Sequence, residues 1–199
     1  VTRGWIGVEP QDLTPELAES FSIPPGTGVI ITGVLQNGPA AQAGIRPGDE
    51  FFCPSSPAWG HGLWHGTLAP LAMGVTTGTF AGRFDAVRLM KALSDFKITN
   101  MSAAATHYRM MKNSGKGGDF SFHFKKLSFT GEPIDDDTAD FVQECFGLPV
   151  CSMYGTTEIG VVLASYPGAE DFPVKRGSLG KAVPGTVVEV HDAEGKVCP

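Results

Sequence analysis

The sequence lacks several features that assign a protein to a class at once. No apolar run approaches membrane-spanning length, and no signal-peptide pattern stands at Val1. Lys and Arg do not cluster, and the net charge is −6, which argues against nucleic acid as a partner. The four cysteines show neither C-x-x-C pairing nor the density of a disulfide scaffold. We therefore expect a cytoplasmic protein with reduced thiols and with neither a membrane nor a nucleic-acid partner.

The pattern of predicted strands and helices changes near Asp49. Apolar residues make up 42% and charged residues 18%, which are globular values. Residues 1–48 read as short strands at 4–10 and 28–34 around small helices at 13–21 and 38–44. From Leu68 onward, strands and helices alternate at the spacing of parallel βαβ units. The sequence predicts two domains, residues 1–48 and 49–199, and the second is predicted to be an α/β fold with a parallel core.

The second domain allows individual elements to be predicted. Helices are predicted at 85–96, 106–115 and 135–147, and strands at 75–80, 98–104, 126–131 and 149–155. In the first of these helices, Leu89, Leu93 and Phe96 should lie on one face. The segment "FSFHFKK" is predicted to be a half-buried strand or a loop that covers the core.

Three polar loops follow the predicted strands, and in a parallel sheet they should meet at one edge. They are "AAATHYR", "TGEPI" and "YGTTEIG". Thr156 and Thr157 follow a glycine where a helix could begin, which suits phosphate binding by backbone N–H groups. Glu158 is a hard oxygen ligand for Mg²⁺, and Tyr154 offers a flat ring for a base. The alternative is that both threonines merely cap a helix whose dipole Glu158 favours. Spacing alone leaves both open.

Five motifs in order resemble one enzyme family: "PSSPAWGHGLW", "LAMGVTTGTFAGRFD", "HYRMM", "FTGEPI" and "SMYGTTEIG". They resemble the adenylate-forming acyl-CoA synthetases, the AMP-binding family, and look most like acetyl-, medium-chain acyl- or aryl-CoA ligases. The likeness covers roughly Gly48 to Pro199, the central part of that family's large domain. Such enzymes join a carboxylic acid to ATP as an acyl-adenylate and then pass the acyl group to coenzyme A. The resemblance therefore implies a fragment of an acid–thiol ligase.

Carried over by position, the resemblance implies a nucleotide site and an acyl pocket. Thr157 and Glu158 would be catalytic, with Thr157 at the α-phosphate and Glu158 holding Mg²⁺. Met153 and Ala105 depart from the family, which usually has glycine and proline there. The implied nucleotide-binding residues are Gly131, Glu132, Pro133, Tyr154, Gly155, Thr156 and Thr157, and the implied acyl-pocket residues are Trp59, Gly60, Leu63 and Trp64.

Other parts of the family's machinery are not found in these 199 residues. No Gly/Ser/Thr-rich loop ending in lysine precedes Trp59. The family's ribose-binding aspartate and the lysine of its C-terminal domain would lie beyond Pro199. Fixed cations and donors of this kind each contribute about 10²- to 10³-fold to a rate. The resemblance therefore implies that this stretch alone is inactive.

The first 48 residues resemble something else. "RGWIGVEPQDLTPELAESF" and "GVIITGVLQNGPAAQAGIRPGD" are similar to the PDZ domains of Do-like periplasmic serine proteases. The likeness implies a truncated domain in which Trp5, Ile6, Gly7 and Val8 form the loop that holds the C-terminus of a peptide partner. It would place this part in the periplasm. "GIRPGDE" is plausible in both families, so the sequence reads as a chimera, and a PDZ-type peptide-binding module is the alternative function.

Some patterns favour ordinary explanations. His61 and His65 stand four residues apart like metal ligands, but no acidic residue lies between them, so pocket or surface histidines are favoured. Asp135, Asp136 and Asp137 are expected at a helix N-terminus rather than in a metal cluster. No Ser-His-Asp arrangement can be assembled around a nucleophile motif, so protease activity is not expected.

Overall fold

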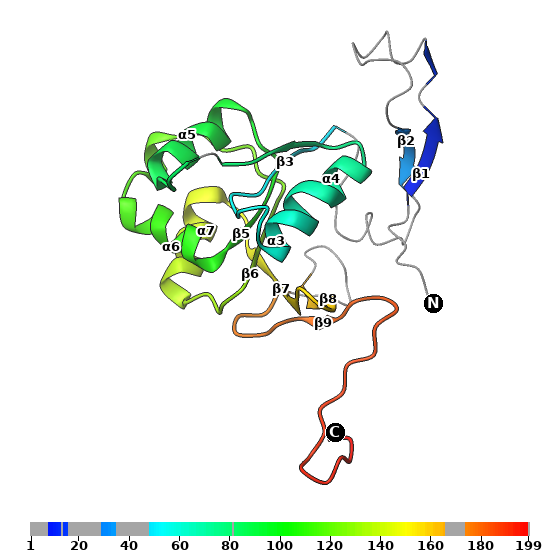
Figure 1. Ribbon diagram of the computed structural model, residues 1–199. Coiled ribbons are helices and arrows are strands. Elements are labelled where there is room, and N and C mark those ends of the chain that lie inside the picture. The colour runs from blue at the N-terminus through cyan, green and yellow to red at the C-terminus, as the bar shows by residue number, and fades with distance from the viewer. Residues whose placement is uncertain are drawn as a thin grey trace.

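The computed structural model describes residues 8–12, 14–15, 29–34, 48–80, 82–165 and 174–198. The main sheet has seven strands in the order β4-β3-β5-β6-β7-β8-β9 (Figure 1). The strands from β4 to β7 are parallel, and β8 and β9 continue the sheet in antiparallel pairing. This mostly parallel arrangement confirms the predicted α/β class. The strands are β3 (Glu50–Phe52), β4 (Thr76–Gly78), β5 (Asn100–Ala104), β6 (Lys126–Thr130), β7 (Val150–Thr156), β8 (Gly160–Ala164) and β9 (Lys181–Ala182).

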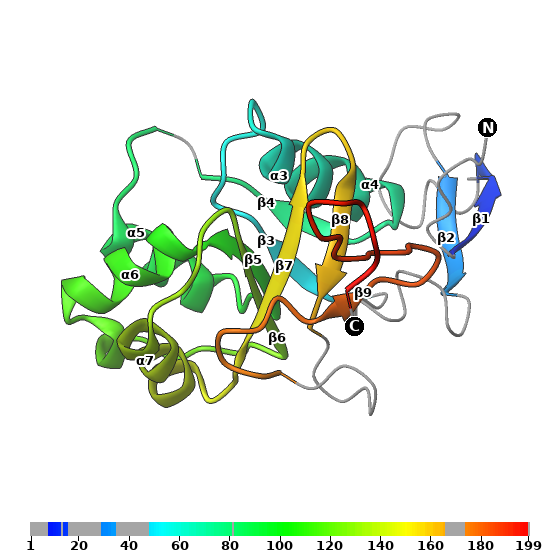
Figure 2. The same ribbon diagram turned by 90° about the horizontal axis from the view of Figure 1, so that it is seen from below.

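Helices connect the parallel strands and lie on both faces of the sheet (Figures 1 and 2). The chain passes from β3 to β4 in one direction and from β4 through β5 and β6 to β7 in the other. Because crossovers are right-handed, this reversal places the first connection on the opposite face from the others. The first connection is a helical run of α3 (Gly60–Leu63), the π-helical turn η1 (Trp64–Leu68) and α4 (Ala69–Ala72). The others contain α5 (Ala86–Asp95), α6 (Ala105–Ser114) and α7 (Asp136–Phe146).

Local signals explain where these helices begin and end. The Asp85 side chain accepts a hydrogen bond from the Arg88 N–H at 2.7 Å and caps α5, and Asp135 caps α7 through the N–H of Thr138. Gly115 and Gly147 end α6 and α7 in the left-handed conformation. The expectation that the aspartates at 135–137 mark a helix N-terminus is therefore confirmed.

The largest core lies between the sheet and α5, α6 and α7. Leu89 and Leu93 are fully buried, but Phe96 is 70% exposed. Phe96 does not continue the face of Leu89 and Leu93, because α5 ends at Asp95 and Phe96 follows as its C-cap residue. Residues 120–125 of the "FSFHFKK" segment form no strand, Lys126 begins β6, and the three phenylalanines are a partly buried cover on the core. Other fully buried members of this core are Met90, Tyr108, Met111, Leu127 and Val142.

Asp49 lies directly before β3 and is buried. Its carboxylate is 2% exposed and accepts a hydrogen bond from Lys125 Nζ at 2.8 Å. The two residues are 76 positions apart, so the contact ties the start of β3 to the segment that leads into β6. A buried carboxylate is strongly unfavourable unless it is paired. Asp49 therefore belongs to the same packed body as β3 and β6.

A separate two-stranded sheet precedes this body. β1 (Val8–Asp12) and β2 (Val29–Val34) pair in antiparallel register. Both overlap strands expected from the sequence. The helices expected at 13–21 and 38–44 lie largely outside the described residues, as do Trp5, Ile6 and Gly7 of the expected peptide loop, of which Val8 begins β1. The division of the chain at residue 48 and the PDZ-like assignment stay predictions.

Two further findings concern the class of protein. Among the described residues, no helix is long and apolar enough to cross a membrane. All four cysteines are free.

Candidate functional site

A cavity of about 650 Å³ opens at the edge of the sheet where the parallel strands end. Three segments surround it: the start of the helical run, the end of β6, and the β7–β8 hairpin. β6 and β7 are neighbours, so the loops that follow them lie side by side, as the sequence predicted. The described residues that line the cavity are Trp59, Gly60, His61, Trp64, His65, Thr130, Gly131, Gly155, Thr156, Thr157, Glu158, Gly160 and Val161.

The structure brings most of the expected site residues to this cavity. Both threonines and Glu158 line it, together with Trp59 and Trp64. Four expected residues are not part of the lining: Leu63, Glu132, Pro133 and Tyr154. Thr130, Gly160 and Val161 do line the cavity but were not expected from the sequence.

The loop after Gly155 differs from its predicted shape. β7 continues through Thr156, a turn covers residues 157–159, and β8 returns antiparallel with Thr156 opposite Gly160. The expectation that a helix begins at Thr156 and Thr157, or is capped by them, was therefore wrong. The physical reason is that the β7–β8 ladder takes up the backbone N–H groups that a helix start would leave free.

Glycines let the walls of the cavity approach each other. A Cβ on Gly60 would lie 2.6 Å from Thr157 Oγ1, so the start of α3 contacts the β7–β8 turn. A Cβ on Gly131 would lie 3.1 Å from Cη2 of Trp59, and Gly131 has a φ of +90°, which disfavours other residues. Gly155 also cannot be replaced without a clash, because an added Cβ would lie 1.8 Å from the carbonyl oxygen of Gly160. These contacts fix the relative positions of the three segments.

His61 links the helical run to the sheet. Its Nδ1 lies 3.0 Å from Ser55 Oγ, and its Nε2 lies 2.7 Å from Ser102 Oγ on β5. Ser128 of β6 donates a hydrogen bond to Ser102 at 2.9 Å and extends the chain of contacts. Burial, together with the smaller effects of the nearby His65 and His107, lowers the pKa of His61 to about 3, so the ring is neutral at physiological pH. The expectation of a pocket histidine is confirmed for His61.

The sequence and the fold of this chain resemble those of known proteins. The AMP-binding enzyme family matches residues 28–199. The chain belongs to this family. The match includes residues 28–48, which the sequence reading assigned to the PDZ-like segment.

Individual relatives of this AMP-binding chain are ligases and synthetases. An uncharacterized acyl–CoA ligase of Bacillus subtilis (strain 168) is 32% identical over 166 residues, which is 82% of this chain and 31% of that protein. A mitochondrial acyl-coenzyme A synthetase of Homo sapiens is 29% identical over 78% of this chain and 26% of its own length. The crystal structure of Brucella canis acyl-CoA synthetase superposes with a TM-score of 0.73 at 27% identity, covering 88% of this chain and 34% of that one. The chain thus spans about a third or less of these relatives.

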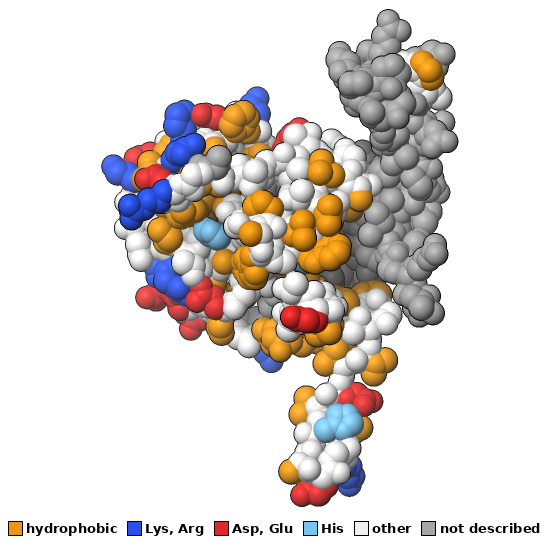
Figure 3. Space-filling view, in the orientation of Figure 1, with side chains coloured by type: hydrophobic (Ala, Val, Ile, Leu, Met, Phe, Trp, Pro, Cys, Tyr) orange, Lys and Arg blue, Asp and Glu red, His pale blue; other side chains and the backbone are white. Residues whose placement is uncertain are grey.

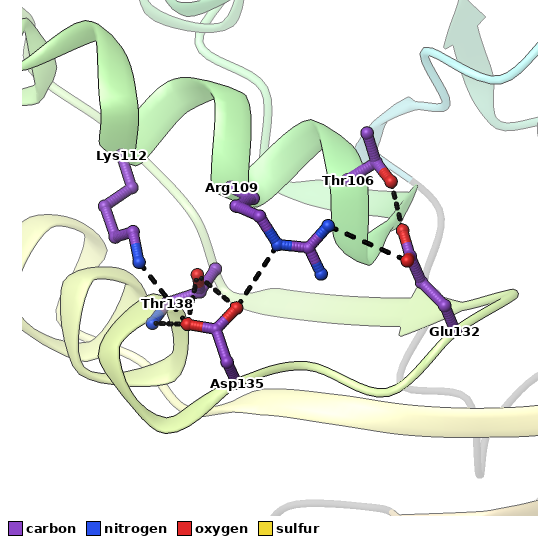
Figure 4. Close-up of polar contacts among 6 residues, drawn as sticks. All are labelled: Thr106, Arg109, Lys112, Glu132, Asp135 and Thr138. Atoms are coloured by element: carbon purple, nitrogen blue, oxygen red, sulfur yellow. Dashed lines mark hydrogen bonds and ion pairs between the residues drawn. The ribbon is translucent and has the colours of Figure 1, made fainter.

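An ion-pair network holds the loop between β6 and α7 in this AMP-binding chain (Figure 4). Glu132 accepts a hydrogen bond from Thr106 at the start of α6 and lies 3.7 Å from Nη1 of Arg109. Arg109 Nε also lies 3.3 Å from Asp135, and Lys112 Nζ lies 3.3 Å from the same carboxylate. The Thr106 hydrogen bond, with help from Arg109, lowers the pKa of Glu132. The side chains are partly exposed, so the network positions the loop rather than adding much stability.

Glu158 lies on the β7–β8 turn and lines the cavity. It is exposed, and a hydrogen bond with the Thr156 side chain lowers its pKa. Glu158 is therefore a carboxylate at neutral pH, next to two threonine hydroxyl groups. The arrangement presents hard oxygen donors to anything bound in the cavity.

Proposed function

We propose that this chain is the part of an adenylate-forming acid–thiol ligase that holds the acyl-adenylate. The relatives are acyl–CoA ligases and acyl-coenzyme A synthetases, which supports a carboxylic acid and a nucleotide as its small-molecule ligands. In this proposal ATP activates the acid, and the acyl group then passes to coenzyme A. The supporting observation is that hydroxyl, carboxylate and aromatic groups converge on one cavity at the carboxyl edge of the sheet.

The residues that line the cavity could stabilise the negative charge that develops in this reaction. A carboxylate that attacks the α-phosphate of ATP brings two anions together, so fixed donors must stabilise the charge that develops. In the proposal, Thr157 on the β7–β8 turn donates its hydroxyl to the α-phosphate, and Gly155 and Thr156 at the end of β7 lie beside the phosphate. Contact with Gly60 restricts the position of the Thr157 side chain and so favours a preorganised donor.

The adenine is proposed to lie beside the β6–α7 loop. Gly131, Glu132 and Pro133 would border the base, and Tyr154 would lie against its ring. Tyr154 is 47% exposed, so its ring is accessible to a base. The Arg109 network would keep this loop in place before the nucleotide binds. On the other wall, Trp59, Gly60, Leu63 and Trp64 would contact the acyl group.

The donor set fits a magnesium ion held jointly with the nucleotide. No group of three or more His, Cys, Asp or Glu side chains able to cage a metal occurs among the described residues. Mg²⁺ is commonly held by one or two carboxylates together with phosphate oxygens and water. Glu158 supplies such a carboxylate and would hold the ion, which neutralises phosphate charge when it is bound.

The test is a calorimetric titration of the chain with AMP and Mg²⁺. Thr157→Val removes the hydroxyl and keeps the shape of the side chain, so AMP affinity should fall by roughly 10- to 100-fold, the effect of losing a hydrogen bond to a charged group. Thr76→Val is the matched control, because Thr76 is exposed on edge strand β4 and does not line the cavity. Equal affinities for the two variants would refute the role of Thr157. The alternative, a PDZ-type peptide module in residues 1–48, stays a prediction.

A further inference from the structure

A second cavity lies in another part of the fold. Its volume is about 160 Å³, and its described lining residues all differ from those of the first cavity. Strands β6 and β7, helix α7 and the segment 174–178 contribute to its walls. A cavity of about 150 Å³ with apolar walls can hold benzene. The second cavity therefore has room for a ligand of about that size.

The interior of the second cavity is largely apolar. Phe129 of β6 and Val150 of β7 line it and belong to the buried core, and Ala139 of α7 lines it as well. The two basic residues of the lining, Lys175 and Arg176, are exposed, and its described residues include no Asp or Glu. Figure 3 shows acidic and basic side chains side by side on the surface around α6 and α7. An apolar group of a ligand therefore finds its favourable surface inside the cavity, and a charged group finds it outside.

Two serine side chains lie next to each other on the same face of the sheet in this cavity. Val150 and Ser152 of β7 both line it, whereas Cys151 between them does not, so the side chain of Ser152 points to the cavity face. Ser165 directly follows β8, and its N–H donates to the carbonyl oxygen of Ser152 at 2.9 Å. Residues opposite each other in antiparallel strands place their side chains on one face, about 4.5–5.5 Å apart at Cβ. The hydroxyl groups of Ser152 and Ser165 are therefore neighbours.

Both hydroxyl groups are buried without a partner. Ser152 is 3% exposed and Ser165 is 2% exposed, and neither Oγ atom has a hydrogen-bond partner within the described residues. Such atoms are uncommon, because a buried polar group gives up its hydrogen bonds to water. A serine side chain can rotate about χ1, so each hydroxyl group can turn toward a bound molecule. One ligand oxygen atom could then bond to both.

We propose that the second cavity binds a small uncharged molecule that has an apolar body about as large as benzene and one hydroxyl group, as phenol has. The ligand hydroxyl donates to one of Ser152 and Ser165 and accepts from the other. Its apolar body contacts Phe129, Ala139 and Val150. A charged group beside two neutral hydroxyls would be buried without a countercharge, which is strongly unfavourable. This inference does not rest on the proposed function, because the first cavity takes no part in it.

The experiment is an NMR titration of the whole isotope-labelled chain with phenol and, separately, with toluene, which has the same size and no hydroxyl group. Phenol should shift the backbone amide signals of Ala139, Ser152 and Ser165 and leave those of Gly131 and Thr157 at the first cavity unchanged. A purely apolar cavity would prefer toluene, because phenol gives up hydrogen bonds to water when it is buried. Here phenol should bind at least as tightly as toluene.

Variants separate the polar and apolar parts of the inference. Ser152→Ala and Ser165→Ala should each weaken phenol binding by about 2- to 10-fold, the effect of one net hydrogen bond, and should not weaken toluene binding. Neither removes a hydrogen bond from the free chain, so the fold should tolerate both. Ala139→Leu fills the cavity and should weaken the binding of both ligands. Glu144→Leu is its matched control, because Glu144 is exposed on the same helix and does not line the cavity, so both affinities should stay unchanged.

Three results would overturn the inference. The first is that phenol fails to shift the amide signals of Ser152 and Ser165. The second is that toluene binds the unsubstituted chain more tightly than phenol does. The third is that Ala139→Leu leaves phenol binding unchanged. The first two are measured on the unsubstituted chain, so they decide the question even if a variant fails to fold.

Discussion

A single methyl group at Gly60 should disturb the phosphate-binding turn without disturbing the fold. In Gly60→Ala the new Cβ would lie 2.6 Å from Oγ1, 3.1 Å from Cγ2 and 3.2 Å from Cβ of Thr157. Ordinary contact begins at 3.4 Å, so the threonine hydroxyl must move by about 0.8 Å. Thr157 is an exposed turn residue and can yield, and alanine at the start of a helix is favourable. We therefore expect nearly unchanged stability.

The expected cost falls on nucleotide binding. A displacement close to 1 Å in a positioned group can cost about 100-fold, and a hydrogen bond to a charged group contributes about 1.5–3 kcal/mol. AMP affinity in Gly60→Ala should accordingly fall by roughly 10- to 100-fold. Gly118→Ala is the matched control, because a Cβ there meets nothing within 4 Å. It should bind AMP as the unsubstituted chain does.

The assay is calorimetric AMP binding together with thermal unfolding, carried out on a double-mutant cycle. In a Thr157→Ala background only the 3.2 Å contact with the Cβ of residue 157 remains, so Gly60→Ala should have little further effect on AMP affinity. If Gly60→Ala weakens binding equally in both backgrounds, the effect does not act through Thr157, and the reasoning is wrong. If the single variant binds AMP normally, the proposed place of the α-phosphate is wrong as well.

Three further changes test other parts of the account. Burial lowers the pKa of His61 from 6.5 to about 3. Between these two pH values only the unfolded chain takes up this proton, so the free energy of unfolding decreases as the pH is lowered. Urea unfolding of His61→Gln between pH 7.5 and 4 should lack this contribution of up to about 1.4 kcal/mol per pH unit; parallel pH profiles for the two proteins would contradict it. Arg109→Gln removes the ion pairs of Arg109 with Glu132 and Asp135 and should weaken AMP binding with little change in the unfolding temperature, whereas Arg109→Lys should recover part of the affinity. Calorimetry of both variants checks this, and an affinity unchanged in Arg109→Gln would exclude the positioning role. Tyr154→Ala should lose roughly 1–3 kcal/mol of AMP binding if the ring stacks on adenine; an unchanged dissociation constant would remove Tyr154 from the site.

The parts of the fold that could be predicted from sequence are those governed by local patterns. The cap at Asp135, the glycine stop at Gly147 and the buried positions Leu89 and Leu93 all follow from helix periodicity and capping chemistry. Phe96 fits the same periodicity but lies one residue beyond the end of α5, and helix ends are the least predictable part of an element.

The parts that could not be predicted depend on contacts between distant residues. Ser102 and Glu132 each bind a partner far along the chain: His61 is 41 residues from Ser102, and Thr106 is 26 residues from Glu132. No local pattern encodes either pairing. The β7–β8 hairpin was missed for another reason, because glycine and two threonines also suit a helix start. The run "GVVLA" after Glu158 was the signal for a returning strand.

The most direct measurement is the place where AMP binds, mapped by NMR on the isotope-labelled chain. With Mg²⁺ present, AMP should shift the backbone amide signals of Gly131, Gly155, Thr157 and Glu158, because the proposed site lies between the end of β6 and the β7–β8 turn. The amides of α5, which packs against the core away from the cavity, should stay unchanged. Shifts confined to other parts of the chain, or no shifts at millimolar AMP, would contradict the claim that this cavity holds the adenylate.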